Sequence, residues 1–104
     1  LEIILDTVTD NFFSLPFGTN ILSSLANNYY ILAKYEKALQ LYNKSLFYFE
    51  ADYNILFNMA LCHFSLNDFH QSFALFKQAQ IKSNTEKVAD WIQKCINNDT
   101  SLIG

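Results

Sequence analysis

The first candidates for catalysis or metal binding in this chain are its two histidines, its two cysteines and the aspartates Asp6 and Asp10. Cys62 and His63 are adjacent, and adjacent side chains on a helix point about a third of a turn apart, so the two cannot share a metal ion without further ligands. Asp6 and Asp10 are one helical step apart, which suits a paired-carboxylate site but is more simply a solvated face. Two glycines are too few for a phosphate-binding loop. We therefore expect a protein that is not an enzyme and holds no metal ion or cofactor.

The composition favours a packed helical domain. Of the 104 residues, 51% are hydrophobic and 16% are charged, which is enough apolar material for a core. One proline and two glycines are few for an all-β fold, which needs many such residues in its turns. The net charge is −3 and all seven basic residues are lysine, so the chain lacks the basic, arginine-containing surface that is typical of nucleic-acid binding.

Cysteine content and hydropathy give expectations for the cellular compartment of the protein. Two isolated cysteines do not make a disulfide framework, and reduced, buried thiols are the expected state. No apolar run is long enough to span a bilayer, so we expect no membrane insertion. The chain begins with LEIIL, which is neither a signal peptide nor a methionine start, and we expect a piece of a longer intracellular, cytoplasmic protein.

Apolar residues recur at three- and four-residue steps along most of the chain, which predicts a series of amphipathic helices. The breaks fall at Lys34–Tyr35, at residues 50–52 and at residues 66–69, and the segment 83–86 offers a helix cap. Short links between amphipathic helices favour antiparallel neighbours. The stripes are formed by Leu22, Leu25, Ala26, Tyr29 and Leu32; by Ala38, Leu39, Tyr42 and Leu46; by Leu56, Met59, Ala60, His63 and Phe64; by Phe69, Phe73, Phe76 and Ala79; and by Val88, Trp91, Ile92 and Cys95.

The helical stripes repeat with a period of 34 residues. Tyr35 and Phe69 are separated by this distance, as are Tyr42 and Phe76. Internal similarity at such a period is typical of stacked helical repeats. The matched pairs also include Leu25 and Met59, Ala26 and Ala60, Tyr29 and His63, and Ser45 and Ala79.

At these positions the chain resembles the tetratricopeptide repeat (TPR) family. The first copy comprises residues 19–52 and the second comprises residues 53–86. Glu50 and Asn84 replace the proline that often closes such a repeat. The residues that resemble the family pattern are Leu22, Leu25, Ala26, Tyr29, Tyr35, Ala38, Tyr42 and Ser45 in the first copy, and Leu56, Met59, Ala60, His63, Phe69, Ser72, Phe76 and Ala79 in the second.

The resemblance implies an all-α protein whose antiparallel helix pairs stack as a right-handed superhelix, a fragment of an α-solenoid. Pro16 lies one period before Glu50, so residues 1–15 are expected to be the second helix of a truncated preceding repeat. The alternative is an N-terminal helix that docks on the first repeat. Residues 87–98 are expected to be a C-terminal capping helix.

The resemblance also implies a scaffold that binds an extended peptide or a helix of a partner protein in a concave groove. Asn27 and Asn58 match asparagines with which the family binds a peptide backbone or terminal carboxylate. Ser23, Val88 and Ile92 stand where relatives that bind acidic tails have cations, which argues against such a ligand. The residues expected to line the groove are Asn20, Asn27, Tyr30, Asn54, Phe57, Asn58, Leu61 and Phe64.

A second candidate surface is aromatic. The aromatic residues gathered near the start of the chain and in the segment LFYFEADY exceed what one small core can bury, and clustered exposed aromatics are typical of interfaces. The alternative function is therefore an assembly or chaperone module that packs into a homo-oligomer or a hetero-oligomer. The candidate interface residues are Phe12, Phe13, Phe47, Tyr48 and Phe49.

Overall fold

The computed structural model describes residues 18–103, and within this range the chain is helical and contains no strand. The predicted all-α class is therefore confirmed for the described residues. The predictions for residues 1–15, and for Phe12 and Phe13, lie outside them. The elements are α2 (Gly18–Ile31), α3 (Tyr35–Tyr48), α4 (Tyr53–Ser65), α5 (Phe69–Lys82), α6 (Glu86–Asn98) and the short 3-10 helix η1 (Thr100–Ile103).

Side-chain caps set where three of the helices begin. Asp52 accepts a hydrogen bond from the backbone N–H of Ile55 at 2.8 Å and starts α4. Thr85 accepts from Val88 N–H at 3.1 Å and starts α6, within the segment predicted to cap this helix. Asp68 caps α5, whereas Lys34, at the start of α3, makes no side-chain cap. A short polar acceptor satisfies an N–H group that the first helical turn leaves free.

The turns after α2 and α4 have the same backbone geometry. Ala33 and Asn67 have φ angles of 60° and 62°, in the left-handed region, although neither is glycine. After α2, the N–H of Lys34 donates to the carbonyl of Tyr29 at 2.8 Å. After α4, the N–H of Asp68 donates to the carbonyl of His63 at 2.8 Å. Both turns are Schellman motifs, which end a helix with one left-handed residue. The 34-residue period of the sequence is therefore also present in the backbone hydrogen bonds.

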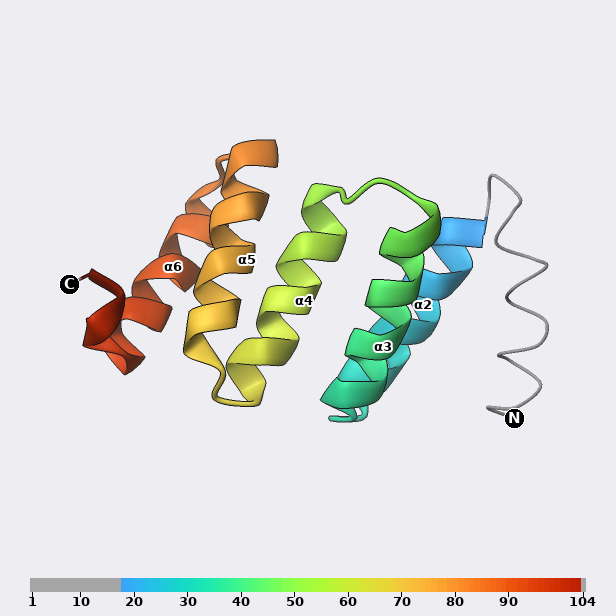
Figure 1. The fold of residues 1–104 in the computed structure, drawn as a ribbon, viewed down its shortest axis with the longest axis horizontal. Helices are drawn as coiled ribbons and strands as arrows, with labels where there is room; N and C mark the ends of the chain where they lie inside the picture. Colours follow the sequence, from blue (N-terminus) through green and yellow to red (C-terminus); the bar gives the residue numbers. More distant parts are fainter. Residues whose placement is uncertain (1–17, 104) are drawn as a thin grey trace.

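Each helix packs against the next helix along the chain, and Figure 1 shows them following one another in sequence order along the molecule. The contacts are most extensive between α2 and α3 and between α4 and α5, and α2 also touches α4. Ala26, Ala38, Ala60 and Ala79 are fully buried. A small residue at a helix crossing lets two backbones approach closely, and a larger side chain would force the helices apart.

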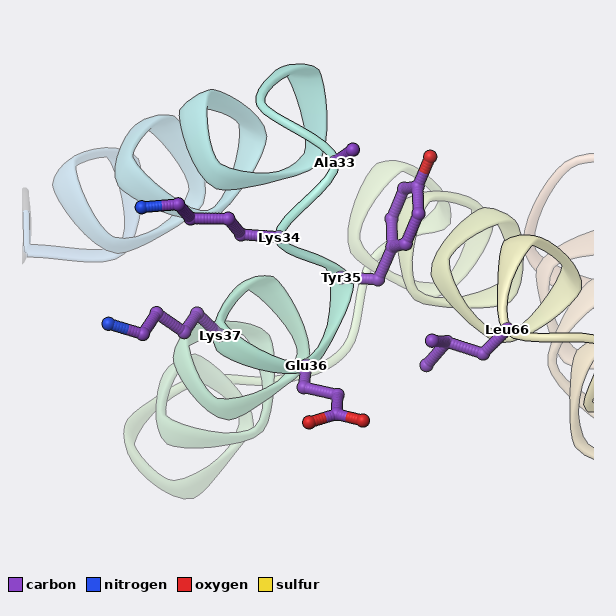
Figure 2. A pocket seen from close by; sticks show the side chains of 6 residues that line it. All are labelled: Ala33, Lys34, Tyr35, Glu36, Lys37 and Leu66. Atoms are coloured by element: carbon purple, nitrogen blue, oxygen red, sulfur yellow. The ribbon is translucent and has the colours of Figure 1, made fainter.

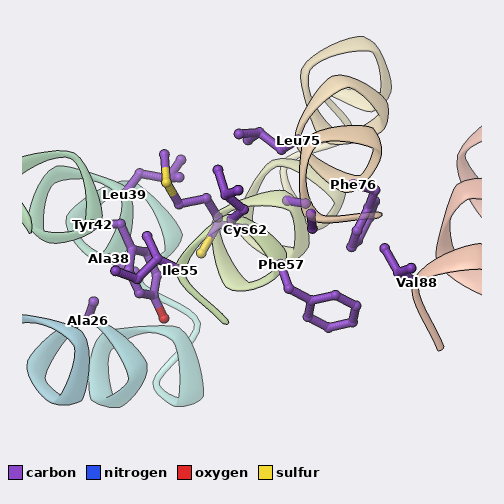
Figure 3. Close-up of a cluster of buried hydrophobic side chains, with 14 of the residues drawn as sticks. Ala26, Ala38, Leu39, Tyr42, Ile55, Phe57, Cys62, Leu75, Phe76 and Val88 are labelled. Carbon is purple, nitrogen blue, oxygen red and sulfur yellow. The ribbon is translucent and has the colours of Figure 1, made fainter. Parts of the chain in front are cut away.

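Two aromatic residues occupy equivalent places in the core, which is drawn in Figure 3. Tyr42 of α3 and Phe76 of α5 are both fully buried and are 34 residues apart. Cys62 and Cys95 are buried free thiols. Among residues 18–103, none of the helices combines the length and the apolar character needed to cross a membrane.

Candidate functional site

A polar recess lies between the exposed sides of α2 and α4 and has a volume of about 440 Å³. Three of the asparagines expected on the groove face, Asn27, Asn54 and Asn58, line it together. Among the described residues, Asp52 is the one charged residue that lines it, and none of them brings a cationic side chain to it. The lining residues are Ser23, Ser24, Asn27, Tyr42, Asp52, Asn54, Ile55 and Asn58.

A hydrogen-bonded triad of side chains forms the floor of the recess and joins three helices. The Tyr42 hydroxyl of α3 donates to Oδ1 of Asn27 in α2. Nδ2 of Asn58 in α4 donates to the same oxygen at 3.2 Å. The sequence pattern placed the two asparagines on the groove face but did not indicate that Tyr42 would bind them. Asn27 is therefore bonded to a buried side chain of the core, and Asn58 is bonded to Asn27.

Burial of Tyr42 is the main reason that its pKa is raised well above the ordinary value of 10.0, and the nearby Cys62 raises it further. The hydroxyl consequently keeps its proton and remains a hydrogen-bond donor at neutral pH. An unpaired buried hydroxyl would cost on the order of 1–3 kcal/mol. Asn27 supplies the acceptor that avoids this cost.

The predicted position of Phe57 in the groove is wrong. It was expected to line the groove, but only 4% of its surface is exposed. Its ring stacks on Tyr53 at 5.6 Å and meets the edge of Phe76 at 5.2 Å. The ammonium group of Lys87, from α6, lies 4.8 Å above the ring centre. A helical wheel drawn for α4 alone cannot predict this burial, because α5 and α6 supply the covering side chains.

Tyr30, Leu61 and Phe64, also predicted for the groove, are not among the residues that line the recess. Phe64 is partly buried and packs edge-on against Phe69 and Trp91, each at 5.1 Å. Tyr30 is partly buried beside Tyr35, at 5.5 Å, and Leu61 packs on the core. Asn20 belongs to α2, but its side chain is outside the described part of the structure. The apolar part of the expected groove is thus mostly helix-to-helix packing.

A second recess, of about 390 Å³, lies where the turn after α2 approaches the end of α4. Figure 2 shows the side chains of Lys34 and Lys37 extending in the same direction, away from Tyr35 and Leu66. Sequence reasoning did not identify this site. The sequence feature that could have indicated it is Leu66, an apolar residue within a polar turn. In the structure, 39% of the Leu66 surface is exposed.

Histidine, serine and aspartate meet at the C-terminal end of the described chain. His70 Nε2 lies 2.8 Å from Asp99 Oδ2 and 3.2 Å from Ser101 Oγ. Both partners approach the same ring nitrogen, so the imidazole cannot pass a proton between a serine on one nitrogen and a carboxylate on the other, as a hydrolase triad requires. The Asp99 pKa is lowered, chiefly by the hydroxyl of Ser101. The cluster attaches η1 to α5.

The remaining candidates for catalysis or metal binding are His63, Cys62 and Cys95. His63 Nδ1 lies 3.2 Å from Asp68 Oδ2, across the turn after α4. Burial raises the pKa of the Cys62 thiol to about 12 and also raises that of Cys95. Over the range 18–103, the structure contains no group of three or more histidine, cysteine, aspartate and glutamate side chains placed to hold a metal ion.

The candidate aromatic interface is exposed mainly at one residue. Phe47 of α3 has 82% of its surface exposed, whereas Tyr48 and Phe49 are partly buried. Ile81 of α5, one repeat period further on, has 84% of its surface exposed. These two side chains are the most exposed large hydrophobic residues in the described chain.

Comparison with known proteins identified no relative of this chain. No protein-family model matches the chain, and no curated protein and no solved structure matches it significantly. The resemblance to TPR repeats therefore stays an expectation from the sequence.

Proposed function

We propose that this chain is a TPR-like module in which the antiparallel pairs α2–α3 and α4–α5 stack side by side and α6 caps the array. The repeated Schellman turns at Ala33 and Asn67 support this arrangement, as do Tyr42 and Phe76, which are buried one period apart. Each pair contacts the next, which is the packing that stacked repeats use to bury their apolar faces.

The module binds an extended segment of a partner protein in the recess between α2 and α4, and it does no chemistry of its own. The observation that supports this function is the concentration of uncharged amide and hydroxyl groups on one concave surface, supplied by both repeats. Amides can donate and accept hydrogen bonds at once, which suits the main chain of an extended peptide.

The charge of the recess argues against an acidic ligand. Within residues 18–103, Asp52 is the one charged group that lines it, and a carboxylate ligand would gain no charge-assisted hydrogen bond from these residues. Val88 and Ile92, which occupy positions where acidic-tail binders have cations, are both buried. The ligand is therefore a neutral or basic segment.

A peptide selection tests this function. The domain would be panned against a library of displayed random dodecapeptides, and affinities of enriched sequences would be measured for the unmodified chain and for Ser24→Arg, which fills the recess with a long side chain. Gln40→Arg is the matched control, because it adds the same side chain at an exposed position of α3 that does not line the recess. We expect Ser24→Arg to abolish binding and Gln40→Arg to preserve it. Equal binding by both variants would place the ligand elsewhere.

Self-assembly is the second candidate function, and the exposure of Phe47 and Ile81 favours it. Exposed large hydrophobic side chains that gather in a patch are typical of protein interfaces. Light scattering across a concentration range would report the oligomeric state of the unmodified chain and of Phe47→Glu. A monomer at every concentration for both proteins would exclude this function, whereas an oligomer that Phe47→Glu dissociates would support it.

A further inference from the structure

The cluster at the C-terminal end of the described chain determines which ring nitrogen of His70 carries a proton. The Ser101 hydroxyl donates to Asp99 Oδ1 at 2.6 Å, so its one proton is used there and its oxygen can only accept from His70 Nε2. Asp99 Oδ2, 2.8 Å from the same nitrogen, is also an acceptor, because the lowered pKa of Asp99 keeps its carboxyl group ionised at neutral pH. An unprotonated Nε2 would face two acceptors. His70 therefore carries its proton on Nε2.

A second proton binds at Nδ1, the other ring nitrogen of His70, and leaves the contacts of Nε2 intact. The His70 side chain has 67% of its surface exposed, so the ring can exchange protons with water. Protonation adds a positive charge to a donor that already lies 2.8 Å from the Asp99 carboxylate. The hydrogen bond, which already has an ionised acceptor, then has an ionised donor as well, and the opposite charges attract each other. The contact is therefore stronger when the imidazole is protonated.

Other titratable groups on α5 and on the helices that pack against it make contacts of their own. On the α4 side, His63 Nδ1 and Asp68 Oδ2 lie 3.2 Å apart. On α6, the Lys94 ammonium lies 4.2 Å from the centre of an aromatic ring of its own helix, and the Cys95 thiol is buried. On α5, the Lys77 ammonium lies 5.8 Å from the centre of a ring of the same helix. The imidazole on α5 and the carboxylate that follows α6 are thus the two opposite charges of this contact.

We propose that His70, Asp99 and Ser101 form a pH-sensitive latch that fastens η1 to α5 more tightly in mildly acidic solution than at neutral pH. The latch does not depend on the proposed binding recess between α2 and α4. Figure 1 shows η1 at the end of the molecule opposite α2. Leu102 of η1 is partly buried against the core, so opening of the latch uncovers apolar surface at this end.

The direction of the pH dependence follows from the two charges. The attraction between His70 and Asp99 is present below about pH 6.5, where an ordinary histidine becomes protonated, and it is lost as the pH rises above this range. The acid limit is set by Asp99, whose pKa is lowered from 3.8 chiefly by the hydroxyl of Ser101. The ionised carboxylate therefore persists below pH 3.8, and the attraction is lost only as the pH falls through the lowered pKa. The latch is tightest between about pH 4 and about pH 6.

Amide exchange with water, measured by NMR, tests the latch in the unmodified chain. The N–H groups of Ser101 and Leu102 donate to Asp99, and opening of η1 exposes them to exchange. Dividing each measured rate by the intrinsic rate at the same pH gives a protection factor. We expect protection to be about threefold higher at about pH 5.5 than at about pH 7.5, a change within the range measured for surface charge pairs. Equal protection at the two pH values would overturn the proposal.

His70→Gln separates the charge from the hydrogen bond. Glutamine offers an NH₂ donor to Asp99 but does not titrate, so we expect its protection factors to be equal at the two pH values. His63→Gln is the matched control, because it removes the other histidine of the chain, which pairs with Asp68. This variant should keep the response of the unmodified chain. A response that survives in His70→Gln, or that disappears in His63→Gln, would assign the pH dependence to another group and overturn the proposal.

The charge pair can also be removed from the side of the carboxylate. Asp99→Asn retains an oxygen that accepts from Ser101 and removes the negative charge, so we expect no response to pH in this variant. Because the two charges lie at the surface, about 0.5 M sodium chloride should reduce the response of the unmodified chain. A response that persists in Asp99→Asn, or that salt leaves unchanged, would contradict an attraction between these two groups.

Discussion

Lys34 and Asp68 have the same backbone conformation at equivalent helix starts, with φ and ψ of −96° and 69° for Lys34 and −92° and 73° for Asp68. They are 34 residues apart, and each follows a residue with positive φ. Only Asp68 forms a side-chain cap, to the N–H of Gln71 at 3.4 Å. The two turns therefore share one geometry, and the start of α3 lacks a stabilising group that this geometry can accommodate.

Lys34→Asp should stabilise the protein by about 1 kcal/mol, because an aspartate at this position can cap α3 as Asp68 caps α5. The negative charge also suits the positive end of the helix dipole. Thermal unfolding should show a melting temperature higher by roughly 5 °C. Lys34→Ala removes the lysine charge without supplying a cap, so an equal gain from both variants would show that the cap is not formed.

Ala33→Gly should stabilise the chain by about 0.5–1 kcal/mol, because Ala33 has a φ of 60° and the left-handed conformation is strained for a residue with a β-carbon. Asn67→Gly is the matched control, with a φ of 62° in the equivalent turn. Asparagine tolerates this conformation better than alanine does, so the gain in stability from Asn67→Gly should be smaller. Urea denaturation of the two variants would measure the difference, and a larger gain at Asn67 would contradict the argument.

Ala38→Leu and Ala60→Leu should each destabilise the protein by about 1–3 kcal/mol, because both alanines are fully buried where helices pack and there is no room for a larger side chain. Ala74→Leu is the control, since Ala74 is exposed on α5. Chemical denaturation would give the change in free energy of unfolding. Silent substitutions at both buried sites would mean that the packing face is wrongly assigned.

The thiols of Cys62 and Cys95 should react very slowly with a disulfide reagent at pH 8 while the chain is folded. Burial raises the Cys62 pKa from 9.0 to about 12, so the reactive thiolate is scarce. The stability gained by burying this neutral thiol is complete below pH 9.0 and is lost as the pH rises towards 12. Absorbance of the released reagent, with and without denaturant, measures the rates. Fast reaction of the folded chain would contradict the burial.

Local features of the sequence were sufficient to predict the helices. The break at Lys34–Tyr35 and the start of α6 after Thr85 lie where the pattern placed them. Apolar residues three and four positions apart, short capping side chains and turn residues act over one or two helical turns, and the sequence displays them directly. The 34-residue period likewise predicted that Ala26 and Ala60 would both be buried.

The candidate site was predictable only in part. The helical pattern and the resemblance to TPR repeats placed Asn27 and Asn58 on the groove face, and the fold brings them within hydrogen-bond distance. Burial of Phe57 was not predictable, because its covering residues come from α5 and α6. Periodicity identifies which residues share a helix face but does not reveal which neighbouring helix covers it.

The sequence by itself determined that the described chain is helical, where its helices begin and end, and that two of its segments are alike, because these properties follow from interactions between residues close in the chain. Only the tertiary structure decided that the Tyr42 hydroxyl holds Asn27 and Asn58, from three different helices, in one polar recess. The reason is that such contacts depend on how helices cross, and the crossing is set by side chains packed from several segments at once.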